Sequence, residues 1–465
     1  MREALKTFFW ILVVTIVAPL VAGYVLRKYQ EYNHNRKLRD DEQRYLGDNY
    51  QESFEEEEPN LTPRPEFDLS QPLQTVKTTS FEPELTINTS QFLKIYNTNA
   101  FLKLFQSAIL KTMKYKKDFY VKEYFKVSRL INQANINSGL DHDINNTRNL
   151  KYQKVLITIL DSIREKIKTV TVRNIKKNLH TILFDTVNGF ASVRGRQTFK
   201  DFLVRRLFAF AKNPMVFNRN PQNILLLGNS GIGKTKLARL VGFTYSKSGI
   251  FMRDIFQEVT PEKLMSEYVS SSANMTRQIL EQSLEGVCFI DEIYALNPKT
   301  GAFQGANHGK ESTDAIVAFA EPNDGKIAIV GAGYGDKVKS QFLSVNEGLA
   351  RRFPHVFTIT DYSSQELTEI CIDFLYQPGN DFKLTNSEAV ILYNLINRLY
   401  SEYPDIFEKQ AGDMKILSES ILTSDLNSVS SSDDNTPIII QGLRQYLSAK
   451  GYTLTHETLV RFLHM

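Results

Sequence analysis

Hydrophobic residues change their spacing several times along the chain, and each pattern predicts a different kind of element. The run 7–26 contains 20 uncharged residues, enough for a helix about 30 Å long. Residues 91–184 carry apolar side chains at intervals of three and four with lysines between them, which predicts a small helical domain. The short apolar runs 224–227 and 287–290 are typical of buried parallel strands.

The run 7–26 is interpreted as a single transmembrane helix. Aromatic residues stand near both of its ends, as at membrane interfaces: Phe8, Phe9, Trp10 and Tyr24. A secretory signal peptide is the main alternative, because Val21-Ala22-Gly23 resembles a cleavage site, but signal peptides have apolar cores of about 7 to 15 residues. More positive charge follows the run than precedes it, so we expect the N-terminus outside and the bulk of the chain on the cytosolic, or an equivalent nucleotide-containing, side.

Charge is distributed unevenly, although the formal net charge is only +4. Residues 40–84 include 13 acidic and 3 basic residues, a net charge of −10, and lack apolar periodicity, so we expect a flexible acidic linker over 27–90. Residues 91–180 hold 18 basic and 6 acidic residues, a net charge of +12. The basic helical domain 91–184 therefore presents either ordinary solvated lysines or a surface for nucleic acid or acidic lipid headgroups.

The composition is that of a folded chain with more than one domain. The chain has 465 residues, about three times the usual domain length, with 42% hydrophobic and 23% charged residues. Cysteine occurs only at Cys288 and Cys371, which excludes a disulfide scaffold and a structural zinc site built on cysteines.

The strand 224–227 is followed at once by the motif GNSGIGKT and then by a helical pattern. Its glycines let backbone N–H groups converge on phosphates, and the helix N-terminus adds partial positive charge. We expect Lys234 to contact the β- and γ-phosphates of ATP and Thr235 to ligate Mg²⁺. The predicted nucleotide site consists of Gly228, Asn229, Ser230, Gly231, Ile232, Gly233, Lys234 and Thr235.

An acidic pair, Asp291-Glu292, ends the second strand, 287–290. The carboxyl ends of parallel strands lie at one edge of a sheet, so we expect the pair to lie beside the phosphate loop. Asp291 is the predicted second protein ligand of the Mg²⁺ shell, and Glu292 is predicted to orient and polarise the attacking water. The sequence thus predicts a site for ATP hydrolysis.

These motifs resemble the AAA+ ATPases, and within them the CbxX/CfxQ branch, which includes red-type Rubisco activases and related sporulation and secretion ATPases. The resemblance covers about residues 185–427, roughly half the chain. It rests on the phosphate loop and on NGFASVRG (188–195), VTPEKLMSEYVSSSANMT (259–276), GVCFIDEIYAL (286–296), GKESTDAIVAFAE (309–321), the segment 329–367 and AGDMKIL (411–417). It implies an α/β P-loop domain with a parallel sheet over 185–360, a C-terminal helical lid over 361–427 and a hexameric ring that remodels protein substrates through its pore.

The resemblance also assigns roles to single residues. Arg352 matches the arginine finger that completes the neighbouring subunit's site, with Arg351 as the nearby alternative. Tyr268-Val269 matches the pore-loop pair that grips a polypeptide, although a packed tyrosine is the alternative. Lys415 stands where the lid of the family has a sensor arginine. A lysine keeps the positive charge of that arginine but cannot form its two parallel hydrogen bonds.

The sequence therefore predicts a membrane-anchored AAA+ ATPase that hydrolyses ATP with Mg²⁺ and remodels or disassembles a protein client, which the sequence does not identify, as a homo-oligomeric ring. The predicted fold is an α/β domain with a lid, preceded by a helical domain and one transmembrane helix, and residues 428–465 are expected to form a loop and a helical tail. The alternatives are a nucleic-acid-handling ATPase that uses the basic helical domain and a membrane scaffold that binds ATP without turnover. A zinc-dependent membrane protease is disfavoured, because the chain lacks an HExxH motif.

Overall fold

The computed structural model describes residues 87–137, 144–171, 175–265, 271–297, 308–380, 382–424 and 435–452. The chain divides into two compact units. Within the described ranges, the smaller unit contains residues 114–137 and 144–161, and the larger unit contains the rest.

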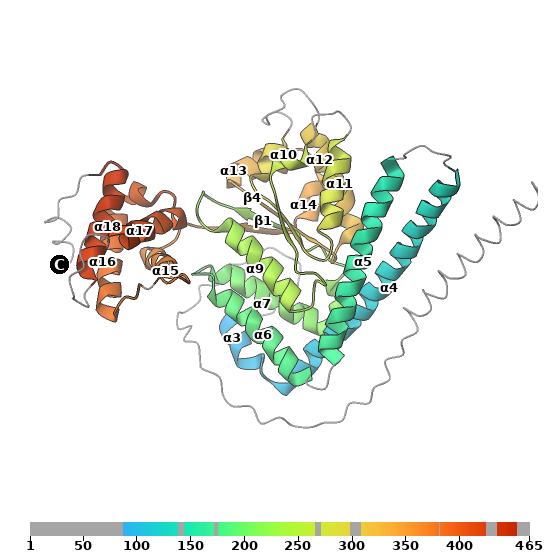
Figure 1. The fold of residues 1–465 in the computed structure, drawn as a ribbon, viewed down its shortest axis with the longest axis horizontal. Helices are drawn as coiled ribbons and strands as arrows, with labels where there is room; N and C mark the ends of the chain where they lie inside the picture. Colours follow the sequence, from blue (N-terminus) through green and yellow to red (C-terminus); the bar gives the residue numbers. More distant parts are fainter. Residues whose placement is uncertain are drawn as a thin grey trace, which may run out of the picture. The chain divides into compact units, whose positions relative to one another are not determined.

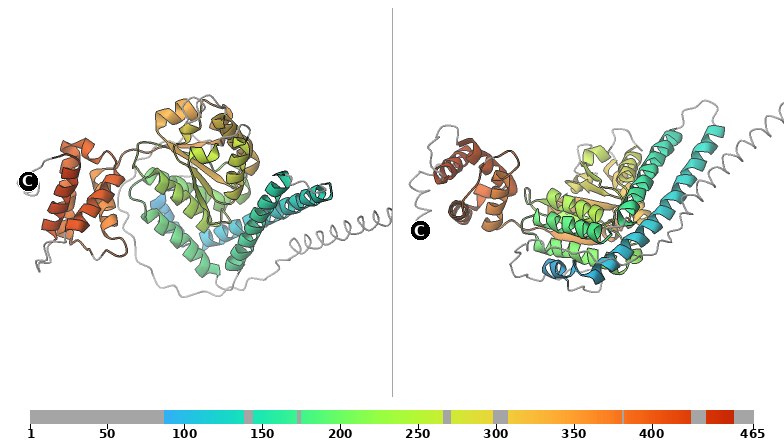
Figure 2. Two further views of the ribbon diagram at one scale, coloured as in Figure 1. Left: turned by 45° about the horizontal axis from the view of Figure 1, so that its top comes forward. Right: turned by 60° about the horizontal axis from the view of Figure 1, so that its bottom comes forward.

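The smaller unit is built from parts of α4 (Asn99–Asn137) and α5 (Ile144–Thr171), two long helices that lie side by side in both views of Figure 2. Both helices bury apolar residues, including Tyr120, Phe125 and Leu156. A side-chain hydrogen bond of 2.8 Å from Gln153 Nε2 to Ser128 Oγ joins the two helices. The three- and four-residue spacing of apolar side chains thus gives these helices buried apolar faces, and most of their lysines are exposed, although Lys116 is buried.

The larger unit contains a parallel sheet of five strands in the order β2-β3-β4-β1-β5. The strands are β1 (Ile224–Leu227), β2 (Phe256–Val259), β3 (Val287–Ile290), β4 (Ala328–Gly333) and β5 (His355–Thr358). The three central strands, β1, β3 and β4, are fully buried, as their continuous apolar sequences require. An α/β fold with a parallel sheet was predicted, and the structure agrees.

Strand order explains where the helices lie. The connection from β1 to β2 runs across the sheet in one direction, whereas those from β2 to β5 run in the other. Because such crossovers are right-handed, α9 (Lys234–Lys247) covers one face, and α11 (Ser272–Gln282) and α12 (His308–Ala320) cover the other, as Figure 1 shows. The carboxyl ends of β1, β4 and β3 then form one edge, since Leu225, Gly331 and Ile290 lie in register.

A helical region follows β5, where the resemblance implied a lid, and it has its own hydrophobic core. It is called the lid below. Its helices are α15 (Ser364–Leu375), α16 (Asn386–Glu402), η5 (Pro404–Phe407), α17 (Ala411–Thr423) and α18 (Thr436–Ala449). Capping boxes start two of them, with Ser363 and Glu366 at α15 and with Thr385 and Glu388 at α16. Ile439 and Leu443 of α18 are buried in the same core, so α18 packs as part of the lid.

Other helices of the larger unit connect these parts. They are α3 (Thr89–Ile95), α6 (Ile175–Ala191), α7 (Gln197–Lys212), α8 (Pro214–Phe217), α10 (Pro261–Leu264), η2 (Ile293–Leu296), η3 (Glu321–Asn323), α13 (Gly335–Lys337), η4 (Val338–Phe342) and α14 (Gly348–Arg352).

The predicted membrane-anchored architecture is not supported and is corrected. Among the described residues, no helix is both long and apolar enough to cross a membrane. The longest of them, α4 and α5, have sufficient length but carry many lysines, which are costly inside a bilayer. The segment 7–26, on which the transmembrane helix and the single-pass localisation were predicted, lies outside the described residues.

Candidate active site

The phosphate loop leaves β1 and returns into α9 through two glycines in the left-handed region, Gly231 (φ 73°) and Gly233 (φ 89°). A Cβ atom at Gly231 would lie 2.0 Å from the backbone oxygen of Lys409, and one at Gly233 would lie 2.6 Å from the Tyr362 hydroxyl. Both positions therefore require glycine for conformation and for space.

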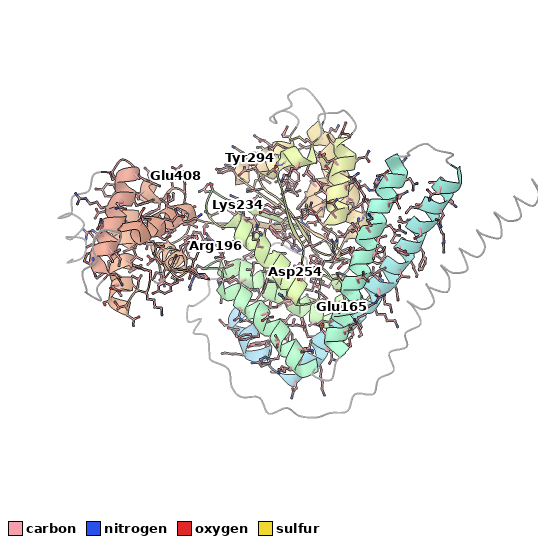
Figure 3. All side chains as sticks on the ribbon, viewed as in Figure 1. Glu165, Arg196, Lys234, Asp254, Tyr294 and Glu408 are labelled. Atoms are coloured by element: carbon pink, nitrogen blue, oxygen red, sulfur yellow. The ribbon has the colours of Figure 1, made fainter. Side chains whose placement is uncertain are left out.

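Lys234 is the first residue of α9, and its side chain folds back over the loop. Its ammonium donates hydrogen bonds to the backbone oxygens of Gly228 (3.0 Å) and Asn229 (2.7 Å). Burial lowers the pKa of Lys234, while the carboxylates of Asp291 and Glu292 act in the opposite direction. Figure 3 labels Lys234 at the start of α9, where its ammonium rests against backbone oxygens of the loop.

The acidic pair follows β3 at the same edge of the sheet. Asp291 Oδ1 accepts a hydrogen bond of 3.0 Å from the Glu292 backbone N–H. Glu292 adopts the left-handed conformation (φ 49°), which is rare for a residue other than glycine and is concentrated at functional sites. Its Oε2 atom is buried and has no hydrogen-bond partner within the described part of the chain, so it can accept a proton or a hydrogen bond from a reactant.

The donor atoms near the loop fit Mg²⁺ bound together with a nucleotide. Thr235, the second residue of α9, offers a hydroxyl, and Asp291 offers a carboxylate. Within the described ranges, no cluster of three or more His, Cys, Asp or Glu side chains could hold a metal ion by itself. Mg²⁺ is typically bound through one or two protein oxygens plus substrate phosphates and water, so this sparse donor set suits it.

Sequence reasoning missed a group of side chains beside the acidic pair: Tyr294, Tyr334 and Lys337. The two tyrosine ring centroids are 6.3 Å apart, and Lys337 Nζ lies 4.9 Å and 5.0 Å from them. Burial, and after it the interaction with Glu292, raises the pKa of the Tyr294 hydroxyl, which keeps it a proton donor. The only signals in the sequence were positional: Tyr294 follows the acidic pair by two residues, and Tyr334 comes directly after β4.

Arg352 lies at the opposite edge of the sheet from the phosphate loop. Its backbone oxygen accepts a hydrogen bond of 2.8 Å from Asn223 Nδ2, immediately before β1 begins. Its guanidinium pairs with Glu321 of η3, and its side chain is 21% exposed. The neighbouring Arg351 is exposed. The structure therefore does not bring either arginine to the phosphate loop of its own chain.

The remaining predicted site residues are Lys415 in the lid and the pore-loop pair Tyr268 and Val269. Lys415 lies on α17 with 61% of its side chain exposed, 3.8 Å from the carboxylate of Glu419. The lid instead reaches the loop through backbone, where Ala411 N–H donates to Gly231 O at 3.2 Å. Tyr268 and Val269, the predicted pore-loop pair, lie outside the described residues.

Part of the chain is similar to known proteins. Residues 224–359 match the family described as "ATPase family associated with various cellular activities (AAA)". The ESX-5 secretion system protein EccA5 of Mycobacterium marinum is 32% identical over 39% of this chain and 29% of its own length. The putative cfxQ-like protein R730 of Acanthamoeba polyphaga mimivirus is 29% identical over 53% of this chain and 58% of its own length. Stage V sporulation protein K of Bacillus subtilis is 32% identical over 34% of this chain and 48% of its own length.

The chain therefore spans less than two thirds of the length of each of these relatives. One of them is named cfxQ-like, which agrees with the resemblance found in the motifs. The matched segment contains β1, the phosphate loop, the acidic pair and β5. Residues 224–359 thus match an AAA ATPase domain, and the candidate site lies within this segment.

Proposed function

We propose that this protein is a Mg²⁺-dependent ATPase whose active sites are shared between neighbouring copies in a ring, and that it uses ATP hydrolysis to remodel a protein. The observation that carries the proposal is the division of the machinery between two edges of one sheet. The loop and the acidic pair lie at the carboxyl edge, whereas Arg352 lies at the amino edge.

Within one chain, the roles follow from position and charge. Lys234 and the loop N–H groups bind the β- and γ-phosphates. Thr235 and Asp291 would hold Mg²⁺, which when bound neutralises charge on the phosphates. Glu292 orients the attacking water through its unpartnered Oε2 and accepts its proton.

Arg352 is too far from its own loop to act there. Asn223, which binds the backbone of Arg352, is separated from Gly228 by the four residues of β1. At about 3.3 Å per residue, the strand alone spans about 13 Å, whereas a guanidinium must approach phosphate oxygens to about 3 Å. An arginine finger at this place therefore serves a neighbouring copy, which makes hydrolysis depend on assembly.

Ring assembly and protein remodelling rest on the resemblance to the CbxX/CfxQ branch. That resemblance supports a hexamer and a central pore in which Tyr268 and Val269 would grip an extended polypeptide.

The test is ATP hydrolysis by the full chain over a range of protein concentrations, with the assembly state measured in parallel by analytical ultracentrifugation with Mg·ATP. The rate per subunit is expected to rise as copies associate. Full activity in a strict monomer would contradict the shared site, and failure to hydrolyse ATP in any assembly would contradict the enzyme.

A further inference from the structure

Arg196 occupies an unusual place at the start of α7. It is the N-cap residue, and it follows Gly195 with both residues in the left-handed region (φ 59° and 60°). This conformation is unfavourable for arginine and persists where surrounding contacts hold it. The turn directs the Arg196 side chain toward the phosphate loop, and Figure 3 labels both Arg196 and Lys234.

The guanidinium of Arg196 joins two segments that are far apart in the sequence. Its Nη2 donates to the backbone oxygen of Ile232 in the phosphate loop at 3.0 Å. Its Nη1 donates to the backbone oxygen of Thr360, after β5, at 2.6 Å. Its planar face stacks on the ring of Tyr362, 3.6 Å from the centroid. One side chain therefore connects the loop to the segment that leads into the lid.

A second connection runs from the lid to Gly231, the loop residue before Ile232. The Tyr362 backbone N–H donates to Gln410 Oε1 at 2.9 Å, and Gln410 is buried. The next residue, Ala411, donates its N–H to Gly231 O at 3.2 Å. Two consecutive loop carbonyls, those of Gly231 and Ile232, are thus held from outside the loop.

Holding a carbonyl fixes the direction of the amide in the same peptide plane. In a trans peptide the C=O and N–H bonds point in opposite directions. Because Arg196 holds the Ile232 oxygen, the Gly233 N–H points away from Arg196, and the Ala411 contact orients the Ile232 N–H in the same manner. Phosphate loops bind phosphates through such converging N–H groups.

We propose that Arg196 is a positioning residue that presets the Ile232–Gly233 peptide for nucleotide phosphate and links this setting to the lid through Tyr362. The inference rests on the proposed nucleotide-binding function, and Arg196 itself does not contact the phosphates.

Two substitutions separate this role from a contribution to folding. Arg196→Lys keeps the charge but loses the planar fork, so it cannot hold two carbonyls and stack at once. Arg196→Gly removes the side chain but relieves the left-handed backbone, which favours folding. Arg239→Lys is the matched control, because Arg239 also stacks on a ring (Phe256, 4.5 Å) and pairs with a partner (Glu258, 2.7 Å), at strand β2.

The experiment measures Mg·ADP affinity of the full chain by calorimetry and amide hydrogen exchange of residues 228–235 without nucleotide. Both Arg196 variants are expected to bind Mg·ADP about tenfold more weakly or worse, with faster exchange confined to the loop and its lid contacts. The Arg239→Lys variant should match the unchanged protein.

Unchanged affinity and exchange in Arg196→Gly would overturn the inference. Faster exchange throughout the larger unit would also overturn it, because it would show a merely structural role. If the unchanged protein does not bind Mg·ADP, the proposed function fails and this inference fails with it, a result distinct from the other two.

Discussion

At the residue scale, the electrostatics of the site depend on Lys234. It is the only side-chain cation in the loop 228–235, and its ammonium rests on two backbone oxygens. Negative phosphates are stronger partners for an ammonium than neutral carbonyls, so nucleotide binding would draw Lys234 away from them.

Lys234→Ala is expected to weaken Mg·ATP binding by about 100-fold or more, because charged hydrogen bonds to two phosphates are lost. Calorimetric titration of the full chain measures this. Lys247→Ala, at the other end of α9, is the matched control and should leave the affinity unchanged. Equal affinities in the two variants would disprove the assignment of the loop.

Glu292→Gln tests the acidic pair in a different way. Glutamine keeps the size of the side chain and leaves Asp291 in place, but it cannot take a proton from water. We expect Mg·ATP affinity close to that of the unchanged protein and a turnover rate lower by at least about 100-fold, measured as phosphate release. Hydrolysis near the normal rate would assign water activation to another residue.

At the scale of elements, a charged cluster joins α7 and the turn before it to α15 of the lid. Arg194 forms two hydrogen bonds with Asp373, of 2.6 and 2.8 Å, and lies 3.5 Å from Glu369. Lys200 is buried nearby, and its burial, followed by the charge of Arg194, lowers its pKa from 10.5 to about 8. The charged form of Lys200 therefore lowers the stability of the folded protein.

The stability of the protein should therefore depend on Lys200 in a defined pH window. Between about pH 8 and 10.5 the unfolded chain binds more protons at this residue than the folded chain, so its contribution to the free energy of unfolding rises with pH. Lys200→Met is expected to be more stable than the unchanged protein by about 1–3 kcal/mol at pH 7. Urea unfolding should show this difference shrinking through the window, and a difference independent of pH would contradict the argument.

The sequence predicted those elements whose signal is local. Strands β1 and β3 are fully buried, so each is a continuous apolar run, and the glycine motif identified the loop between β1 and α9. Strand β2 (FQEV) is partly exposed at the edge of the sheet and gave no comparable pattern. Arg196 could not be predicted, because its partners Ile232 and Thr360 lie 36 and 164 residues away.

At the scale of the whole molecule, the proposed role of Arg352 implies that one copy cannot complete its own site. Arg352→Ala should bind Mg·ATP normally but hydrolyse it about 10³-fold more slowly, as expected for loss of an arginine finger. Arg351→Ala is the matched control on the same helix and should retain most activity. If Arg351→Ala is the impaired variant instead, the finger is Arg351.

The most direct test of a shared site mixes two inactive variants of the full chain. Glu292→Gln copies have an inactive site but an intact Arg352, and Arg352→Ala copies have an intact acidic pair but no finger. The account predicts that mixed assemblies regain ATP hydrolysis in proportion to the interfaces at which a Glu292→Gln copy supplies its Arg352 to the site of an Arg352→Ala copy. Mixing Arg352→Ala with the double variant Glu292→Gln/Arg352→Ala should give no recovery. No recovery in assemblies shown to contain both single variants would contradict it.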